Sequence, residues 1–442
     1  MNAPGTAYET ALAAFYYAFP VFEMARMRAA TSPRRNPAGE FAGDGPQSTL
    51  RWMNLFTRTR ALLGPQDWQV VTPNNDTLYT NAWLDLSRGP LLLRVPDTAD
   101  RYYVLGLLDF YTNPFAHIGR RATGTSEREF LLHGPGWLGK TPAGATPVAC
   151  PTDGVWILGR ILVDGVDDVP AVNRLQDGFS LRPLDGGDAH AGHRLDVWMG
   201  PKETADEPWR FVDIVNRALA QNPPPVCEEE LMRAFGSVGI GPHRTANPDA
   251  LDAQTRDALE RAMRDGLSDL ARATAGAAKN GWRLPVTVGE NYGSDYRTRA
   301  LVARNYIGVL GADEALYLIA ETDGAGESLA GRNRYRLFFA QGALPPVDAF
   351  WSITMYRKSS CLLVENPIGR YSIGDRTRGL VRGPGGALEI SIGIGSPEAS
   401  QRANWLPAPA DDFYLVLRVY QPRPAFLDGS YVVPPVERLQ VA

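Results

Sequence analysis

The sequence predicts an α+β fold that is mainly β, with two β-sandwich or jelly-roll-like domains, N-terminal helices and a helical insertion between the domains. Three observations predict it. Short apolar runs bounded by Pro, Gly and Asp recur at the spacing of sandwich strands. The 442 residues are too many for one ordinary core, which favours two domains. Helical periodicity is confined to the start and the middle of the chain.

The N-terminal part is predicted to be helical. Residues 6–30 and 48–63 are expected to form helices, and the Pro, Gly and charge content of residues 31–47 predicts a loop. We expect the first helix to be amphipathic and to break near Pro20. This segment lacks the basic start of a signal peptide, and no stretch is long enough to span a membrane. We therefore expect a cytoplasmic protein with no membrane partner.

From about residue 66 the pattern changes to short strands. The predicted strands of the first half are "WQVVT", "PLLLRVP", "RYYVLGLLDFY" and "GVWILGRILV". The predicted strands of the second half are "ALYLIAE", "RYRLFFA", "AFWSITMY", "CLLVE", "ALEISIG" and "FYLVLRVY". The expected units are N-terminal helices over 1–65, a first β domain over 66–182, a loop and helical block over 183–312, and a second β domain over 313–442.

Three helices are predicted inside the helical block. The first begins behind Pro208, and the second repeats apolar residues from Leu259 to Leu270 and stops at Asn280-Gly281. The third covers about 295–310 and ends at Gly311. Residues 183–203 before them are expected to form a polar loop.

An internal echo suggests that the two β domains are related. "VPDTADRYY" in the first half and "VENPIGRYS" in the second share a Val, an Asp or Asn, an Arg and a Tyr at one offset. The matched residues are Val95, Asp97, Arg101 and Tyr102 in one half, and Val364, Asn366, Arg370 and Tyr371 in the other. We interpret the echo as duplication or convergent sandwich geometry.

Charge and motifs exclude several classes of function. The net charge is −4 and no basic run occurs, so nucleic acid is not expected as a partner. The three cysteines are far apart, so they predict neither a disulfide framework nor a metal site and are expected to be small buried apolar residues. The chain has no Walker A motif, G-x-S-x-G elbow or dinucleotide fingerprint, so we expect no cofactor.

The histidines offer two candidate sites. His190 and His193 lie near Asp188 and Asp196 and leave a metal-dependent enzyme open as an alternative, although a Gly-rich loop would not orient them. His117 follows a strand and precedes two arginines, so it is a candidate acid or base. A strand-end histidine bonded to backbone is the structural alternative.

Carboxylate, phenol and guanidinium groups at strand ends form the main candidate site. Arg160 lies inside an apolar strand, and a buried charge requires a partner, for which Asp109 or Asp76 is expected. Such a cluster either binds and protonates a small ligand or fixes strand register. The candidate catalytic residues are Asp76, Tyr79, Asp109, His117 and Arg160, and the candidate substrate-binding residues are Asn75, Asn113, Trp351, Tyr356, Arg370, Asn404 and Arg418.

Longer motifs resemble a bacterial protein family. "TPNNDTLYTNAWLDLSRGPLLLRVPD", "RYYVLGLLDFYTNPFAHIGRRATG" and "VWILGRILV" resemble the domain of unknown function DUF1254. "PPVDAFWSITMY", "VENPIGRYSIGDRT", "NWLPAP" and "FYLVLRVYQP" resemble its usual partner, DUF1214. The resemblance covers most of residues 10–435 and implies the two β domains with their helices. It implies no general activity.

The leading hypothesis is a cofactor-independent enzyme that acts by acid–base chemistry on a small organic molecule, as a lyase, isomerase, cyclase or hydrolase. In this hypothesis Asp or His is the base and Arg holds an anion. A non-catalytic protein that binds small molecules or carbohydrates is the alternative, since jelly rolls carry lectins and the chain has ten tryptophans. A homo-oligomer is expected because strand edges need to be covered.

Overall fold

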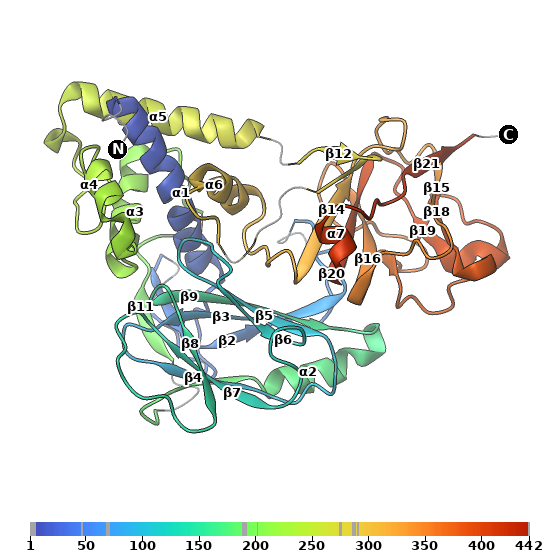
Figure 1. Cartoon of the computed structure of the whole chain (residues 1–442), viewed down its shortest axis with the longest axis horizontal. Coiled ribbons are helices and arrows are strands. Elements are labelled where there is room, and N and C mark those ends of the chain that lie inside the picture. The colour runs from blue at the N-terminus through green and yellow to red at the C-terminus, as the bar shows by residue number, and fades with distance from the viewer. Residues whose placement is uncertain are drawn as a thin grey trace.

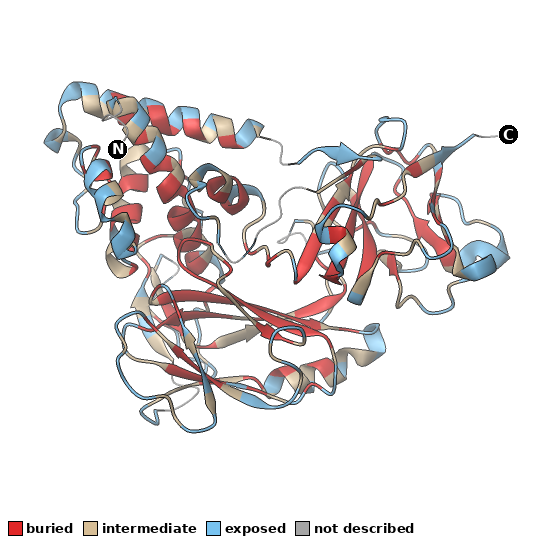
Figure 2. Ribbon diagram, viewed as in Figure 1, coloured by how far each residue is buried: buried red, intermediate tan, exposed pale blue. Residues whose placement is uncertain are grey.

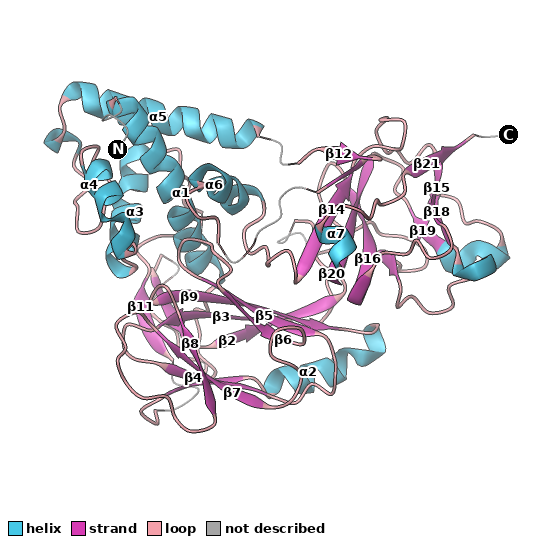
Figure 3. Ribbon diagram, viewed as in Figure 1, coloured by secondary structure: helices cyan, strands magenta, loops and turns pink. Residues whose placement is uncertain are grey.

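The computed structural model describes residues 6–45, 47–67, 71–187, 192–200, 202–273, 276–284, 289 and 291–440. The chain forms three parts that meet at the centre of the molecule: a helical part, a first β domain and a second β domain (Figure 1). The secondary-structure view separates the helices at the upper left from the two groups of strands (Figure 3). The fold is α+β and mainly β, as the sequence predicts.

The helical part is built around one long, buried helix. A capping box between Thr6 and Glu9 starts α1, which packs against the helices that follow the first β domain. The predicted break at Pro20 is wrong, because α1 continues through it: proline removes one backbone donor, and apolar packing around the buried ring holds the helix together. The helices are α1 (Ala7–Thr31), α3 (Pro208–Gln221), α4 (Glu229–Gly236), α5 (Ala253–Arg272) and α6 (Tyr296–Asn305).

The first β domain consists of two sheets. The larger sheet has the order β2 (Phe56–Arg58), β3 (Thr77–Asp85), β9 (Gly154–Leu162), β5 (Tyr103–Leu108), β6 (Ala116–Gly119). The smaller sheet has the order β10 (Ser180–Pro183), β4 (Leu91–Val95), β7 (Arg128–His133), β8 (Ala145–Ala149). All pairs are antiparallel except β7 with β8. Helix α2 (Val169–Asp177) leads into β10, and β1 (Leu50–Met53) pairs with β11 (His193–Asp196).

The second β domain repeats this arrangement. Its larger sheet has the order β12 (Ala278–Lys279), β13 (Trp282–Arg283), β14 (Ala315–Ala320), β20 (Phe413–Pro422), β16 (Val347–Arg357), β17 (Ser372–Gly374). Its smaller sheet has the order β19 (Trp405–Pro407), β18 (Leu388–Gly393), β15 (Arg334–Phe339), β21 (Val436–Leu439), with β18 and β19 parallel. The short helices are α7 (Pro424–Leu427), η1 (Val166–Asp168), η2 (Val226–Glu228), η3 (Pro248–Ala250), η4 (Pro384–Gly386) and η5 (Ala399–Asn404).

Side-chain alternation gives each larger sheet an inner and an outer face. The inner face packs on the smaller sheet of its own domain, as Leu78 and Ile157 do in the first domain and Leu316 and Leu417 do in the second. The outer face is also buried, so the central strands are red throughout (Figure 2). These strands are therefore nearly continuous apolar runs, and a polar residue within one of them lies in a low-dielectric environment.

The two β domains share one topology. In chain order, β3 to β9 of the first domain correspond to β14 to β20 of the second, and the registers agree residue by residue. Arg160 lies between Tyr79 and Val104, and Arg418 lies between Tyr317 and Ser352. This agreement is what the predicted duplication or convergent sandwich geometry requires.

The predicted echo, however, aligned the wrong residues. Val95 ends β4, whereas Val364 lies outside the strands after β16. The matching glycines are Gly119 and Gly374. At each, an added Cβ would come within 2.5 Å or 2.2 Å of the carbonyl oxygen of Tyr103 or Trp351, so the close strand approach requires glycine.

The outer faces of the two larger sheets pack against each other through equivalent residues. Tyr102 and its counterpart Phe350 are in edge contact, with ring centroids 5.4 Å apart. Arg376 Nη2 lies 2.9 Å from Asp76 Oδ1, and its counterpart Arg121 binds Glu314, with Nε 2.7 Å from Oε2. We call these two bridges the interdomain ion pairs. Because each side presents the same groups to the other, the interface has the form of a twofold dimer contact within one chain.

Several predicted elements differ from the structure. Residues 48–63 were predicted to be a helix but contain β1 and β2, because tertiary strand pairing overrides local periodicity. The predicted loop over 183–203 contains β11, and the third helix ends at Asn305 rather than Gly311. Asn280-Gly281 does not stop a helix; it is the turn of the β12–β13 hairpin, with positive φ at both residues.

Two further predicted strands are not observed as such. "CLLVE" forms only an isolated bridge at Leu363. In "WQVVT", residues 68–70 lie outside the described residues, and Val71 and Thr72 are not in a strand.

The interdomain ion pairs can be tested by a double-mutant cycle. Asp76 is 5% exposed, so we expect Asp76→Ala to lower the free energy of unfolding by about 2–4 kcal/mol, with a coupling energy to Arg376→Ala of about 1–3 kcal/mol. The measurement is urea unfolding of the two single variants and the double variant. The exposed pair Arg94–Glu127 is the matched control and should give a coupling below about 1 kcal/mol. Equal coupling in both cycles would contradict a structural role for the interdomain pair.

Candidate functional site

A cavity of about 560 Å³ lies where the three parts of the molecule meet. Its walls come from the outer faces of β3 and β9, the outer faces of β14 and β20, and the segment from α6 to β14. Most of the lining is apolar, with Val302, Ile307, Leu310, Ile319 and Val416 among its side chains. A largely apolar cavity at a domain junction with a few polar groups is typical of a small-molecule site.

Arg160 is the most unusual group in the wall. Its side chain is buried on β9, and its guanidinium lies 5.6 Å from the centroid of the Tyr79 ring. Nη2 donates to the carbonyl oxygen of Gly308 at 3.3 Å, whereas Nε and Nη1 are buried and have no hydrogen-bond partner in the described structure. A buried cation with unsatisfied donors is costly, and each such group in a native protein requires an explanation.

The predicted partner of Arg160 is wrong. Asp76 binds Arg376 and accepts a 2.5 Å hydrogen bond from Ser352, so both of its oxygens are occupied. Asp109 accepts from the side chain and backbone of Asn113 and from the backbone of Tyr111. Among the residues that the structure describes, no carboxylate forms an ion pair with Arg160. The alternation of a strand predicts where an arginine points, but it cannot predict which loop meets it.

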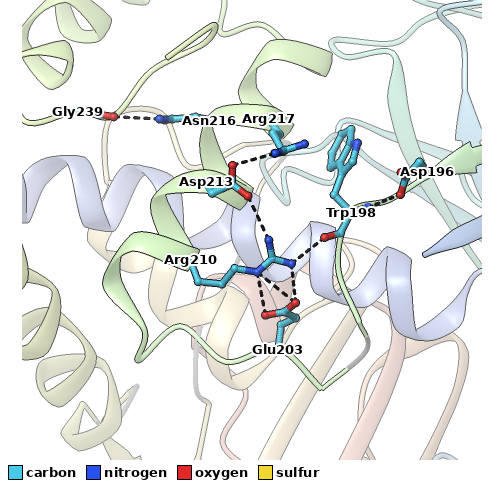
Figure 4. A network of polar contacts seen from close by, with 8 residues as sticks. All are labelled: Asp196, Trp198, Glu203, Arg210, Asp213, Asn216, Arg217 and Gly239. Atoms are coloured by element: carbon cyan, nitrogen blue, oxygen red, sulfur yellow. Dashed lines mark hydrogen bonds and ion pairs between the residues drawn. The ribbon is translucent and has the colours of Figure 1, made fainter. Parts of the chain in front are cut away.

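A contrasting arginine shows how this protein satisfies a guanidinium elsewhere. Arg210 on α3 binds Glu203 at 2.7 Å and Asp213 at 3.1 Å, and Nη2 donates to the carbonyl oxygen of Trp198 at 2.7 Å (Figure 4). Two carboxylates therefore neutralise a half-buried side chain there. The more deeply buried Arg160 has neither.

Arg418 is the counterpart of Arg160 and lines the same cavity. It is buried, and its Nη groups donate to Thr354 Oγ1 at 2.8 Å, Tyr356 Oη at 2.7 Å and the carbonyl oxygen of Thr72 at 3.2 Å. These acceptors are neutral, so Arg418 keeps its full positive charge while its orientation is fixed.

Tyr317 lies opposite Arg418 in the pairing of β14 with β20 and lines the cavity together with Arg160. Its hydroxyl is buried and has no hydrogen-bond partner in the described part of the chain. Burial raises the pKa of the Tyr317 phenol, while Arg160 and Arg418 act to lower it. Tyr317 is therefore a neutral phenol at neutral pH that can donate one hydrogen bond and accept another.

The polar side of the cavity is completed by the stretch "TPNND". Asn74 lines the wall and donates to Tyr420 Oη at 2.7 Å, and Thr72 shares a 2.7 Å hydrogen bond with Tyr414. Tyr356 donates to the carbonyl oxygen of Pro73 at 2.5 Å. This short stretch of the first domain therefore forms hydrogen bonds with the second domain and is also part of the cavity wall.

The structure brings together three of the predicted site residues and separates the others. Tyr79, Arg160 and Arg418 line the cavity. Asp76 and Asn75 line a different, polar cavity of about 350 Å³, and Asn75 donates to the carbonyl oxygen of Leu63.

His117 lies on β6 outside the cavity lining. Its Nε2 accepts a 3.2 Å hydrogen bond from the backbone N–H of Gly311, which is the structural alternative that the sequence left open.

The remaining predicted binding residues hold the fold. Trp351 is in the core of the second domain, and Tyr356 is buried behind Arg418. Arg370 donates to the carbonyl oxygens of residues 402, 403 and 405. Asn404 bonds the backbone of Val381 and Glu389, and Asn113 bonds Asp109.

The predicted histidine pair lies partly outside the described residues. His190 and Asp188 are not among them. His193 is described, and its Nε2 lies 2.7 Å from Asp85 Oδ2. In the described ranges no group of three His, Cys, Asp or Glu side chains could hold a metal ion.

The three cysteines have different environments. Cys150 is buried, Cys227 is exposed and Cys361 is partly exposed in the cavity wall, so the prediction of three buried residues is wrong for the last two. The short runs around Cys227 and Cys361 do not form strands or core helices, so their side chains are left near the surface.

The sequence analysis missed Tyr317 and Asn74 as site residues. A signal for Tyr317 was present, because "DTLY" at 76–79 and "EALY" at 314–317 repeat an acidic residue, a Leu and a Tyr. Each acidic residue forms an interdomain ion pair, and each Tyr lines the cavity.

Comparisons with known proteins agree with this architecture. The family DUF1254 matches residues 53–183 and the family DUF1214 matches residues 314–424, and each is described as a protein of unknown function. The chain belongs to this two-domain family of unknown function. No curated protein matches the chain.

Two solved structures are similar over nearly the whole chain. The VPA0106 protein from Vibrio parahaemolyticus has 22% sequence identity and a TM-score of 0.76, covering 98% of this chain and 100% of that chain, which shows the shared fold. An uncharacterised protein from Burkholderia cenocepacia has 14% identity and a TM-score of 0.42, covering 97% of this chain and 88% of that chain. Within the described residues, no helix has the length and apolar character needed to cross a membrane.

The role of His117 predicts a pH dependence of stability. Burial, followed by the charge of Arg121, lowers the pKa of His117 to about 4. A depressed histidine pKa stabilises the fold fully above the unfolded value of about 6.5, and this stability is lost as pH falls toward 4. We expect the wild type to lose about 1–2 kcal/mol between pH 7.5 and 5 that His117→Gln does not lose, measured by urea unfolding. The same pH slope in both proteins would contradict this assignment.

Proposed function

We propose that this protein is an enzyme that binds a small organic anion in the cavity between its β domains and transfers a proton on it. One observation supports the proposal above the others: Arg160 lines the cavity as a buried cation, and two of its nitrogen atoms have no hydrogen-bond partner among the described residues. An anionic group of a ligand, such as a carboxylate, would accept hydrogen bonds from these donors.

The same arrangement suits acid–base chemistry next to a carboxylate. When guanidinium groups neutralise a carboxylate, the adjacent C–H becomes more acidic, because negative charge that develops in the transition state is stabilised. The hydroxyl of Tyr317 and the phenol of Tyr79 line the same cavity, and either can donate a proton to the ligand. Tyr317 accepts a proton only as its phenolate, which burial disfavours by raising its pKa and the charges of Arg160 and Arg418 favour by lowering it. Lyase and isomerase reactions are consistent with these groups.

The alternative of a carbohydrate-binding protein has less support. Trp83 and Trp156 stack on each other, with centroids 5.1 Å apart, against the helical part, and Trp351 is in the core. These tryptophans present no face to a sugar. Independence from cofactors, a cytoplasmic location and homo-oligomeric assembly stay predictions from the sequence.

Removing the charge of Arg160 should separate binding from stability. In the ligand-free protein we expect Arg160→Met to raise the free energy of unfolding by about 1–3 kcal/mol, because an unsatisfied buried cation is removed. The same variant should lose the rise in melting temperature that small carboxylates give the wild type at constant ionic strength.

Arg418→Met is the matched control for this experiment. It removes three hydrogen bonds to neutral oxygens, so we expect it to lower the free energy of unfolding by about 2–4 kcal/mol. If Arg160→Met is destabilised as strongly as Arg418→Met, Arg160 serves the fold rather than a ligand.

Proton transfer can be measured without knowing the full reaction. Small carboxylates are incubated with the protein in D₂O, and exchange of the hydrogen next to the carboxylate is followed by NMR. We expect Tyr317→Phe to slow this exchange by about 10²- to 10⁴-fold while the ligand still binds. Unchanged exchange in Tyr317→Phe would remove this residue from the reaction, and binding without any exchange in the wild type would favour a non-catalytic binding protein.

A further inference from the structure

Equivalent side chains from the two β domains line one cavity. The first domain contributes Tyr79 and Arg160 as neighbours on β3 and β9, and the second contributes Tyr317 and Arg418 as neighbours on β14 and β20. The four residues occupy the same positions of the shared topology. The cavity therefore receives one phenol and one guanidinium from each half of the duplicated fold.

The charges of the lining are unbalanced. The described lining holds four cationic side chains and one carboxylate, although the whole chain has a net charge of −4. The carboxylate, Glu321, is bound at 2.8 Å by Arg283 and lies 3.9 Å from Lys358. It is thus already paired with the two cations that are not on β9 or β20, and the charges of Arg160 and Arg418 are left uncompensated within the lining.

Each of the two guanidinium groups requires an anionic group of the ligand to neutralise its charge. A single monoanion neutralises one buried cation and leaves the other, whereas a ligand with two anionic groups neutralises both. Both arginines line the same cavity, and each lies opposite the tyrosine of its own domain in the strand pairing, so one ligand in the cavity can contact both. The volume of about 560 Å³ falls in the range of roughly 300–1,000 Å³ that small-molecule sites have.

We propose that the ligand is a small dicarboxylate with an apolar middle section. Arg160 and Tyr317 bind one carboxylate through the donors that have no partner in the described part of the chain. Arg418, held in place by Thr354 and Tyr356, supplies the positive charge that faces the second carboxylate. The apolar side chains between them contact the carbon chain. This inference rests on the proposed function, because it specifies the anion that the cavity binds.

The test compares diacids with their monomethyl esters. Butanedioate, hexanedioate and octanedioate, each with its monomethyl ester, are titrated into the full-length protein by calorimetry at constant ionic strength. We expect at least one diacid to bind the wild type about tenfold or more tightly than its monoester, since the ester has the same length but one charge fewer. In Arg160→Met this preference should fall to within about twofold.

The control variant is Arg94→Met, which removes an exposed charge from β4 and should keep the preference for the diacid. Equal affinity of diacid and monoester for the wild type, with measurable binding of both, overturns the two-headed ligand and leaves the proposed anion site in place. Binding of neither class overturns both this inference and the proposed function.

Discussion

The contact between the two larger sheets is the constraint on which the rest of the structure depends. It is held by Asp76 with Arg376 and by Glu314 with Arg121, and the carboxylate of each bridge lies directly before a central strand, β3 or β14. Buried charges tolerate little displacement, because an unpaired carboxylate in this environment is strongly destabilising. The two bridges therefore fix the angle at which the outer faces meet, and the space left between these faces is the cavity.

The helical part makes this contact asymmetric. In the first domain, α1 and its neighbours cover the outer face around Trp83, Trp156 and Leu158. In the second domain the corresponding end of the sheet, around Ile319 and Val416, is left to line the cavity. Two sheets of the same topology thus have different neighbours. Arg418 donates to Thr354 and Tyr356 of its own domain and to Thr72 of the first, while Arg160 has one hydrogen-bond acceptor, the carbonyl oxygen of Gly308, among the described residues.

The sequence predicts much of the fold and only part of the site. Central strands such as β9 and β20 are long apolar runs with clear boundaries, so periodicity locates them, and the arginine within each is visible as an anomaly. The prediction of a helix over residues 48–63 is wrong because the strands there are short and depend on partners far along the chain. Asp76 and Asp109 were expected to pair with Arg160 because a carboxylate is the usual partner of a buried arginine. The conformation of the loop that carries each carboxylate determines which group it actually contacts. The conformation of a loop depends on tertiary contacts, so it could not be predicted from this single sequence.

The pairing of Tyr102 with Phe350 has an evolutionary consequence. When equivalent residues touch across an interface, one copy of the unit would make the same contact with a second identical copy. A chain formed by fusion of two dimer-forming units would have this contact, and its ancestral cavity would have had two identical halves. In an unfused dimer every substitution occurs twice, so neither half can specialise. Fusion removes that restriction, and the two halves of the cavity can then differ, as Arg160 and Arg418 do in their hydrogen bonds.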